Sequence, residues 1–258
     1  MHPILVSFFG INLYSYGLFA ALGFFTAFLY ISNTVNKSQG RIISQRHLQN
    51  LFLYSVIAAI VGARISYVLT NLRSFLSAPA DIFKIWEGGL VYYGGFICAV
   101  LFVIFYCKSN KIDVFKFSDI IAPALALGHA FGRIGCFMAG CCYGKPSNAL
   151  WSVVFSNPDS LAVKNVHIHP TQIYESLSDF IIFILLRAYN KKSHADGKTA
   201  AFYMIGYAAM RFVVEFFRGD FRGDYFFGLS PSQNISILLF ACGVLLLFVS
   251  AKREKCFR

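Results

Sequence analysis

Seven long apolar windows constrain the fold of this chain more than any other feature. Each approaches the ~20 residues that an α-helix needs to cross a hydrocarbon core of ~30 Å. Backbone polar groups in lipid must be satisfied within the segment, so the windows predict helices. The composition agrees, because 57% of the 258 residues are hydrophobic and 14% are charged, against about 25% charged in an average soluble domain. The windows are 13–32, 49–70, 88–107, 117–135, 170–188, 199–217 and 228–250. The sequence therefore predicts an all-α, polytopic membrane protein with seven transmembrane helices, forming one domain over residues 1–258.

The distribution of basic residues predicts the orientation. With the N-terminus outside, fourteen of the 23 Lys and Arg residues lie on the inner side, including Arg41 and Arg258, and six lie on the outer side, including Arg222. This positive-inside bias predicts a periplasmic or outside N-terminus, a cytoplasmic C-terminus and an outward-facing loop region at 136–169. The net charge of +11 then follows from topology and contact with membrane lipids, so no nucleic-acid partner is predicted. No Lys or Arg precedes Lys37, which favours a permanent first span over a cleaved signal peptide.

Arg133 is an ionisable residue inside a predicted span, and such residues are by default a hypothesis of function. It lies in "GHAFGRIGCFMAGCCYGKP", residues 128–146, which is rich in glycine. Glycines let a backbone or a ligand headgroup approach closely. The segment therefore predicts an anion site, and the alternative is that Arg133 only pairs with a carboxylate to hold two helices together.

The sixth window ends in a second group of charged residues. Tyr207, Arg211, Glu215 and Arg218 recur at i, i+4, i+8 and i+11, so one helical face is predicted to carry all four. Two arginines around one glutamate leave a surplus of positive charge, and guanidinium groups suit phosphate well. The alternative is an intramembrane salt bridge with a structural role.

The fifth window carries the acidic partners that these arginines would need. It begins with "HPTQIYE", residues 169–175, and Gln172, Glu175 and Asp179 fall on one face at i, i+3 and i+7. Carboxylates in an apolar helix need partners, and we expect the arginines to supply them. Taken singly, each residue is also compatible with a simple helix–helix contact.

Glycines and tyrosines mark two further segments. In "GGLVYYGGF", residues 88–96, two glycine pairs bracket Tyr92 and Tyr93, which indicates an interrupted or closely packed helix start. Near the N-terminus, "YSYGL" contains Tyr14 and Tyr16. Tyrosines at such positions are often interfacial anchors.

The cysteines do not predict a metal site. Cys136, Cys141 and Cys142 have the spacing C-x4-C-C, whereas zinc sites usually show C-x2-C with a second pair of ligands. No matching ligand set lies nearby in the sequence, so we expect no metal and no cofactor, with metal ligation or a disulfide as the alternatives. The cysteines inside predicted spans are interpreted as packing residues: Cys98, Cys107 and Cys242.

The ordered motifs "YSYGL", "GHAFGRIGCFMAGCCYGKP", "HPTQIYE", "RFVVEFFR" and "GLSPSQNIS" resemble those of the bacterial prolipoprotein diacylglyceryl transferases over nearly the whole chain. The resemblance implies an enzyme of the bacterial inner (cytoplasmic) membrane, with its reaction near the outer face. Members transfer the diacylglyceryl group from phosphatidylglycerol to the lipobox cysteine thiol of preprolipoproteins and release glycerol 1-phosphate. A monomer is expected.

Matching by motif implies roles for individual residues. The catalytic positions are Arg211, Arg133, Glu215 and Tyr93. The substrate-binding positions are Arg133, Arg218, Tyr16, Tyr207, Glu175, Gly144, Gly94 and Gly95. Arginines preorganised in a site of low dielectric would stabilise the charge of the departing phosphate, and Glu215 is expected to orient Arg211.

Two positions depart from the family pattern. Tyr93 stands where many members have a histidine proposed as a base, and Cys136 stands where many have asparagine. A phenol with a pKa of ~10 is a poor base at neutral pH, but the nucleophile is a thiol with an ordinary pKa of ~8.5 that needs little help. These departures leave open a diverged non-catalytic paralogue. The residues are also compatible with an anion-binding membrane transporter, although no convincing internal repeat is present, and with a thiol or metal redox protein.

Overall fold

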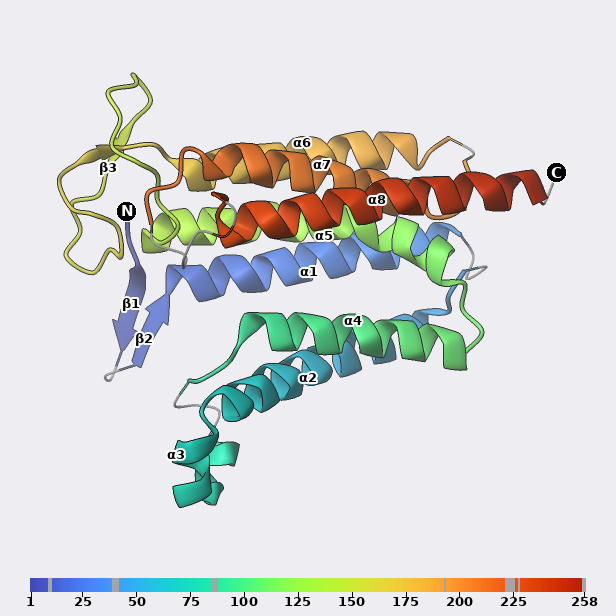
Figure 1. Cartoon of the computed structure of the whole chain (residues 1–258), viewed down its shortest axis with the longest axis horizontal. Helices are drawn as coiled ribbons and strands as arrows, with labels where there is room; N and C mark the ends of the chain where they lie inside the picture. The colour runs from blue at the N-terminus through green and yellow to red at the C-terminus, as the bar shows by residue number, and fades with distance from the viewer. Residues whose placement is uncertain are drawn as a thin grey trace. The chain divides into compact units, whose positions relative to one another are not determined.

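The computed structural model describes residues 1–8, 11–38, 42–84, 88–192, 194–220, 226 and 228–256. Each of the seven predicted windows overlaps a long helix, so the all-helical prediction is confirmed (Figure 1). These helices are α1 (Ser15–Lys37), α2 (Gln45–Thr70), α4 (Tyr92–Ser109), α5 (Val114–Ala139), α6 (Thr171–Tyr189), α7 (Lys198–Glu215) and α8 (Pro231–Cys256). The shorter elements are β1 (Ile4–Phe8), β2 (Ile11–Tyr14), α3 (Leu72–Ser77), the 3-10 helix η1 (Pro79–Phe83), β3 (Val153–Val154) and β4 (His167–Ile168). Arg41, Arg222 and Arg258, which enter the predicted orientation, lie outside the described residues.

Five helices among the described residues are long and apolar enough to cross a membrane: α1, α2, α4, α5 and α8. Helices α6 and α7 match predicted windows but are more polar. Each contains three charged residues, which are Glu175, Asp179 and Arg187 in α6 and Lys198, Arg211 and Glu215 in α7. The structure thus gives a multi-pass membrane architecture with five clear candidate spans.

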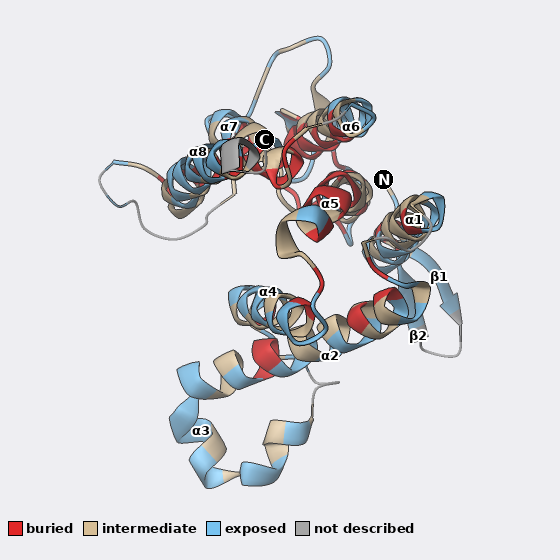
Figure 2. Cartoon of the chain, turned by 90° about the vertical axis from the view of Figure 1, so that its right-hand side faces the viewer, coloured by how far each residue is buried: buried red, intermediate tan, exposed pale blue. Residues whose placement is uncertain are grey.

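Backbone contacts divide the chain into two compact units, Met1–Ile31 with Ser118–Arg258, and Ser32–Phe117. In the first unit, the buried residues of α5, α6 and α7 gather on the sides that face one another (Figure 2). Small side chains let these helices approach closely, and large ones fill the remaining space. The core consists of Ala122, Ala126, Phe183, Leu186, Ala200 and Tyr203.

Asp119 fixes where α7 begins. Its carboxylate accepts hydrogen bonds from the backbone N–H groups of Gly197 (2.7 Å) and Ala200 (2.9 Å). The first N–H groups of a helix have no intrahelical partner, and Gly197 offers no side chain to cap them. The carboxylate from α5 therefore supplies the cap and ties the two helices together.

The segment between α5 and α6 forms an ordered cap with a small core of its own. Strands β3 and β4 pair antiparallel within it, and Phe155, Ala162 and Ile168 are buried together against Met1. The Asn157 side chain also donates a hydrogen bond to the backbone oxygen of Met1 (3.2 Å). The N-terminal residue and the 140–170 segment thus stabilise each other.

In the second unit, α2 and α4 pack at close range through glycine. A methyl group at Gly62 would lie 2.4 Å from the Cβ of Cys98, and one at Gly94 would lie 1.8 Å from the Ser66 hydroxyl oxygen. At Gly95 it would lie 2.7 Å from the backbone oxygen of Ala59. The close packing predicted for this glycine-rich helix start is therefore present, and Cys98 acts there as a small packing residue.

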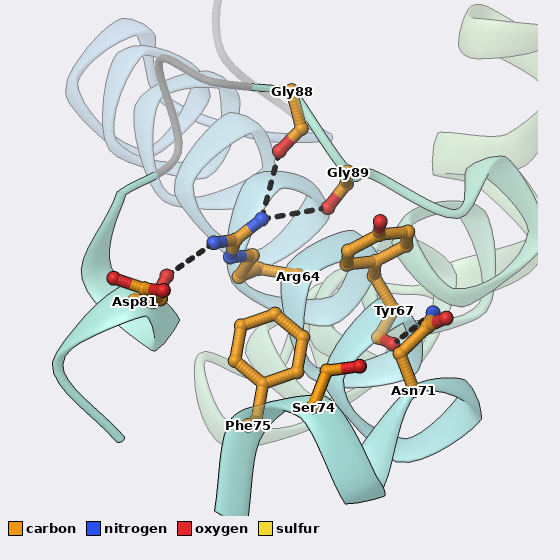
Figure 3. A pocket seen from close by; sticks show the side chains of 8 residues that line it. All are labelled: Arg64, Tyr67, Asn71, Ser74, Phe75, Asp81, Gly88 and Gly89. Atoms are coloured by element: carbon orange, nitrogen blue, oxygen red, sulfur yellow. Dashed lines mark hydrogen bonds between the residues drawn. The ribbon is translucent and has the colours of Figure 1, made fainter. Parts of the chain in front are cut away.

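Arg64 holds the loop that precedes α4 (Figure 3). Its guanidinium donates to the backbone oxygens of Ile82 (2.9 Å), Gly88 (2.7 Å), Gly89 (3.1 Å), Asp81 (2.5 Å) and Lys84 (3.2 Å). A guanidinium group has five N–H donors, so these five backbone oxygens use all of the donors of Arg64. Arg64 is therefore a structural cation that stabilises the turn at Gly88 and Gly89, where φ is +90° and +74°.

Candidate functional site

Glu175 is the centre of a buried ion-pair cluster that joins three helices and a loop. The Oε2 atom of Glu175 lies 2.5 Å from Arg133 Nε, and its Oε1 atom lies 3.1 Å from Arg211 Nη1 and 3.0 Å from Arg218 Nη1. The carboxylate is 0% exposed. A buried charge is tolerated only when it is paired, and one carboxylate here receives three guanidinium groups. The structure thus brings together arginines that are up to 85 residues apart in the sequence.

Arg211 is oriented from its own helix and from the start of α8. Its Nη2 atom lies 2.8 Å from Glu215 Oε2 and donates to the Ser232 hydroxyl at 3.0 Å. Glu215 in turn accepts a hydrogen bond from the Ser230 hydroxyl at 2.8 Å. Ser230 also accepts from the backbone N–H of Gln233 in the first turn of α8, which is an N-cap interaction. The helix start therefore fixes both members of the Arg211–Glu215 pair.

Arg218 does not share the α7 face as the spacing predicted, because the helix ends at Glu215. After the helix, the backbone packs directly against the segment around Gly144. The approach is so close that a methyl group at Gly219 would lie 2.6 Å from the Gly144 oxygen. Gly144 and Arg218 form a β-bridge. From this bridge Arg218 reaches Glu175 and also donates to both carboxylate oxygens of Asp220 at 2.8 Å.

Neighbouring carboxylates stabilise the charged form of the Arg218 guanidinium. Burial alone lowers the pKa of this guanidinium, but the hydrogen bonds to Asp220 and the nearby Glu175 charge raise the pKa above its ordinary value. Asp220 also changes the charge balance of the cluster. Three arginines face three carboxylates, from Glu175, Glu215 and Asp220, so the surplus of positive charge expected from α7 alone is offset.

Arg133 differs from the other two arginines in having free donors. Its Nε lies 2.5 Å from Glu175 Oε2, and among the described residues no hydrogen bond is made by its two terminal nitrogens. The side chain is 19% exposed. The four N–H groups of these nitrogens therefore have no hydrogen-bond acceptor among the described residues.

Aromatic groups flank the cluster. The Tyr207 ring centroid lies 5.3 Å from that of His129, and His129 Nδ1 lies at a hydrogen-bond distance of 3.1 Å from the Tyr203 hydroxyl oxygen. His129 is therefore a packed histidine with its own partner. Tyr16 is the second residue of α1, and its backbone packs on α5, where a methyl group at Gly135 would lie 3.3 Å from the Tyr16 oxygen.

Comparison with known proteins identifies a family that matches nearly the whole chain. The model of the prolipoprotein diacylglyceryl transferase family matches residues 3–249. The chain belongs to this family. It is 36% identical over 255 residues to the phosphatidylglycerol–prolipoprotein diacylglyceryl transferase of Clostridium tetani, covering 99% of this chain and 100% of the relative. Similar relatives are transferase 2 of Clostridium perfringens, at 38% over 246 residues (95% and 94% of the two chains), and the transferase of Bordetella avium, at 34% over 243 residues (93% and 90%).

The structure gathers most of the residues to which the family motifs assign roles. Arg133, Glu175, Arg211, Glu215 and Arg218 form the cluster itself. Gly144 lies at the bridge to Arg218, and a methyl group there would lie 2.4 Å from the His169 backbone oxygen. Tyr16 in α1 and Tyr207 in α7 belong to the same unit as the cluster. The other three residues belong to the second unit, at the start of α4: Tyr93, Gly94 and Gly95.

Several polar residues of the site were not predicted from the sequence. Ser230 and Ser232 orient the Arg211–Glu215 pair, and Asp220 pairs with Arg218.

Thr171 was missed as well, and it lies beside Gln172 in the first turn of α6. Both are 0% exposed and donate to the backbone oxygens of Cys142 (2.8 Å) and Cys141 (2.7 Å), respectively. The serine-rich start of α8 is the signal that points to Ser230, because polar residues at a helix start are typical caps.

Proposed function

We propose that this chain transfers the diacylglyceryl group of phosphatidylglycerol to the lipobox cysteine thiol of preprolipoproteins, the first step of lipoprotein maturation. Membership of the family and the activity for which its full-length relatives are named support this proposal. The observation that carries it is Arg133, whose free terminal N–H groups lie beside a buried cluster of fixed arginines. A guanidinium with unused donors in a water-poor site is suited to a phosphate.

In the proposed reaction, Arg133 binds the phosphate of the lipid headgroup, with Arg211 nearby. The substrate thiol loses its proton, which the departing phosphate takes up, and its sulfur attacks the glyceryl carbon. The C–S bond forms as the C–O bond to phosphate breaks, and glycerol 1-phosphate leaves with the electron pair of that bond. Preorganised guanidinium groups stabilise the developing negative charge. Glu175 and Glu215 serve as positioning residues, because they hold the arginines at fixed distances.

Seven further residues take part in the proposed reaction. Arg218, Tyr16, Tyr207 and Gly144 contribute to substrate binding at the cluster. Tyr93 acts in place of a histidine, with Gly94 and Gly95 allowing the lipid to approach the start of α4.

We also propose that α6 and α7 cross the membrane with the five more apolar helices, as a monomeric single domain in the bacterial inner membrane. Their charged residues Glu175, Arg211 and Glu215 are paired with one another, and pairing reduces the cost of charge within a bilayer. The positive-inside bias supports an N-terminus outside and a C-terminus in the cytoplasm.

The test is lipid transfer in proteoliposomes that contain radiolabelled phosphatidylglycerol and a lipobox peptide. Arg211→Ala is expected to lower transfer by about a hundredfold, as loss of one preorganised donor does elsewhere. Arg187→Ala is the matched control, because Arg187 is an exposed arginine at the end of α6, and it is expected to retain wild-type activity. Full activity in Arg211→Ala would refute the assignment.

Complementation separates an enzyme from a diverged paralogue. A bacterial strain depleted of its own transferase is expected to grow with this chain and not with Arg211→Ala. Absence of growth and of transfer with the unaltered chain, despite normal membrane insertion, would favour the non-catalytic paralogue. Anion flux without lipid transfer would favour the transporter.

A further inference from the structure

Three thiols converge at the end of α5, at a place that the proposed reaction does not use. Cys136 lies in the last turn of the helix, and Cys141 and Cys142 follow it. The three sulfur atoms all lie within 4.8 Å of one another. The backbone reverses between them through left-handed conformations at Gly140 (φ +79°) and Cys142 (φ +64°). This reversal explains how the unusual spacing C-x4-C-C becomes a compact group.

The turn that carries the thiols is held in place from several sides. The Gly140 N–H donates to the backbone oxygen of Cys136 (2.9 Å), and a methyl group at Gly140 would lie 2.0 Å from the Ser160 hydroxyl. The buried side chains of Thr171 and Gln172 donate to the backbone oxygens of Cys142 and Cys141. The thiols are therefore preorganised by neighbouring residues, as the ligands of a metal site are.

The ligand form of a thiol is the thiolate. Three thiolates around a divalent cation carry a net charge of −1, and the Arg218 guanidinium is a hydrogen-bond partner of the Cys142 thiol.

We propose that Cys136, Cys141 and Cys142 bind one zinc ion through their sulfur atoms. Thiolates select soft or borderline metals such as zinc over magnesium or calcium. Zinc–sulfur bonds of ~2.3 Å in tetrahedral geometry place the sulfur atoms about 3.8 Å apart, so the observed group needs to contract by about 1 Å or less. Each thiol that is still protonated releases its proton on binding.

Three protein ligands leave the fourth position of a tetrahedral ion open to water or to an external ligand, which is the arrangement of catalytic rather than structural zinc sites. Among the described His, Cys, Asp and Glu side chains, no fourth ligand joins the three thiols. A zinc site here goes beyond the proposed lipid transfer, and its test does not depend on that activity.

The first measurement is the zinc content of the full-length protein, purified in detergent with a thiol-free reductant and dialysed against zinc. About one zinc ion per chain is expected, and the Cys136→Ser/Cys141→Ser/Cys142→Ser variant is expected to lose it. The matched control replaces three other cysteines, Cys98, Cys107 and Cys242, by serine and is expected to keep the metal. Equal zinc content in both triple variants, or no zinc in the reduced wild type, would overturn the proposal.

A second measurement uses the wild-type chain and does not depend on the folding of a variant. Zinc is expected to slow alkylation of the three thiols by N-ethylmaleimide by about tenfold, because coordinated thiolates are withdrawn from reaction. The exposed Cys242 should react at an unchanged rate. Unchanged rates at all positions, or a disulfide among the three thiols that persists in place of metal binding after reduction, would exclude the site.

Discussion

The substitution Glu175→Gln tests whether the buried cluster depends on this one carboxylate. Glutamine keeps the size of the side chain and removes the charge. Three guanidinium groups, from Arg133, Arg211 and Arg218, then lose an ion-pair contact at distances of 2.5–3.1 Å. Arg211 and Arg218 retain Glu215 and Asp220, whereas Arg133 has no other carboxylate within salt-bridge distance among the described residues.

The expected loss follows from the burial of the pair. Removing one partner of a buried salt bridge costs about 3–5 kcal/mol, because the other charge stays buried without compensation. At ~2–4 °C per kcal/mol for a protein of this size, the unfolding midpoint in detergent is expected to fall by about 6–20 °C. Lipid transfer is expected to fall as well, because the arginines are no longer held at fixed positions.

Asp179→Asn is the matched control. Asp179 lies one helical turn after Glu175 and is likewise 0% exposed, but both of its oxygens lack a hydrogen-bond partner among the described residues. An unpaired buried carboxyl group is costly, so this change is expected to leave the midpoint unchanged or raise it. The midpoint is read by intrinsic tryptophan fluorescence during heating. A fall as large as that of Glu175→Gln, or a shift below about 3 °C in Glu175→Gln, would refute the reasoning.

Three other substitutions probe the surroundings. Gly144→Ala is expected to destabilise the chain by about 1–3 kcal/mol through overpacking, because its methyl group would lie 2.4 Å from the His169 oxygen; an unchanged thermal midpoint would contradict this. Arg64→Leu removes five hydrogen bonds to backbone oxygens, so the loop before α4 is expected to open more often. Trypsin should then cleave after Lys84 about tenfold faster, and an equal cleavage rate would argue against the role of Arg64. Tyr93→Phe is expected to lower lipid transfer without abolishing it, because the attacking thiol needs little help; complete loss would assign an essential role to the hydroxyl.

The cysteine cluster shows a proximity of side chains that spacing alone does not reveal. The pattern C-x4-C-C without a second ligand pair predicts no metal, because zinc sites are usually recognised by short regular spacings. In the structure, the left-handed backbone at Gly140 and Cys142 brings all three thiols together. Backbone reversals of this kind depend on contacts with other segments, such as those of Thr171 and Gln172, and these contacts are not visible in the local sequence.

The sequence by itself determined where the long helices lie, because the length and apolarity of a segment are local properties, and for the five most apolar segments the bilayer requirement turns them directly into helix. It also determined which side chains carry charge in an apolar setting. Only the tertiary structure decided how those charges pair. Arg218 leaves the helix on which the spacing placed it and still reaches Glu175, 43 residues away, while Arg64 serves the loop before α4 rather than the cluster. Such pairings depend on how distant segments pack, and a periodic pattern within one segment contains no information about the neighbour that it will meet.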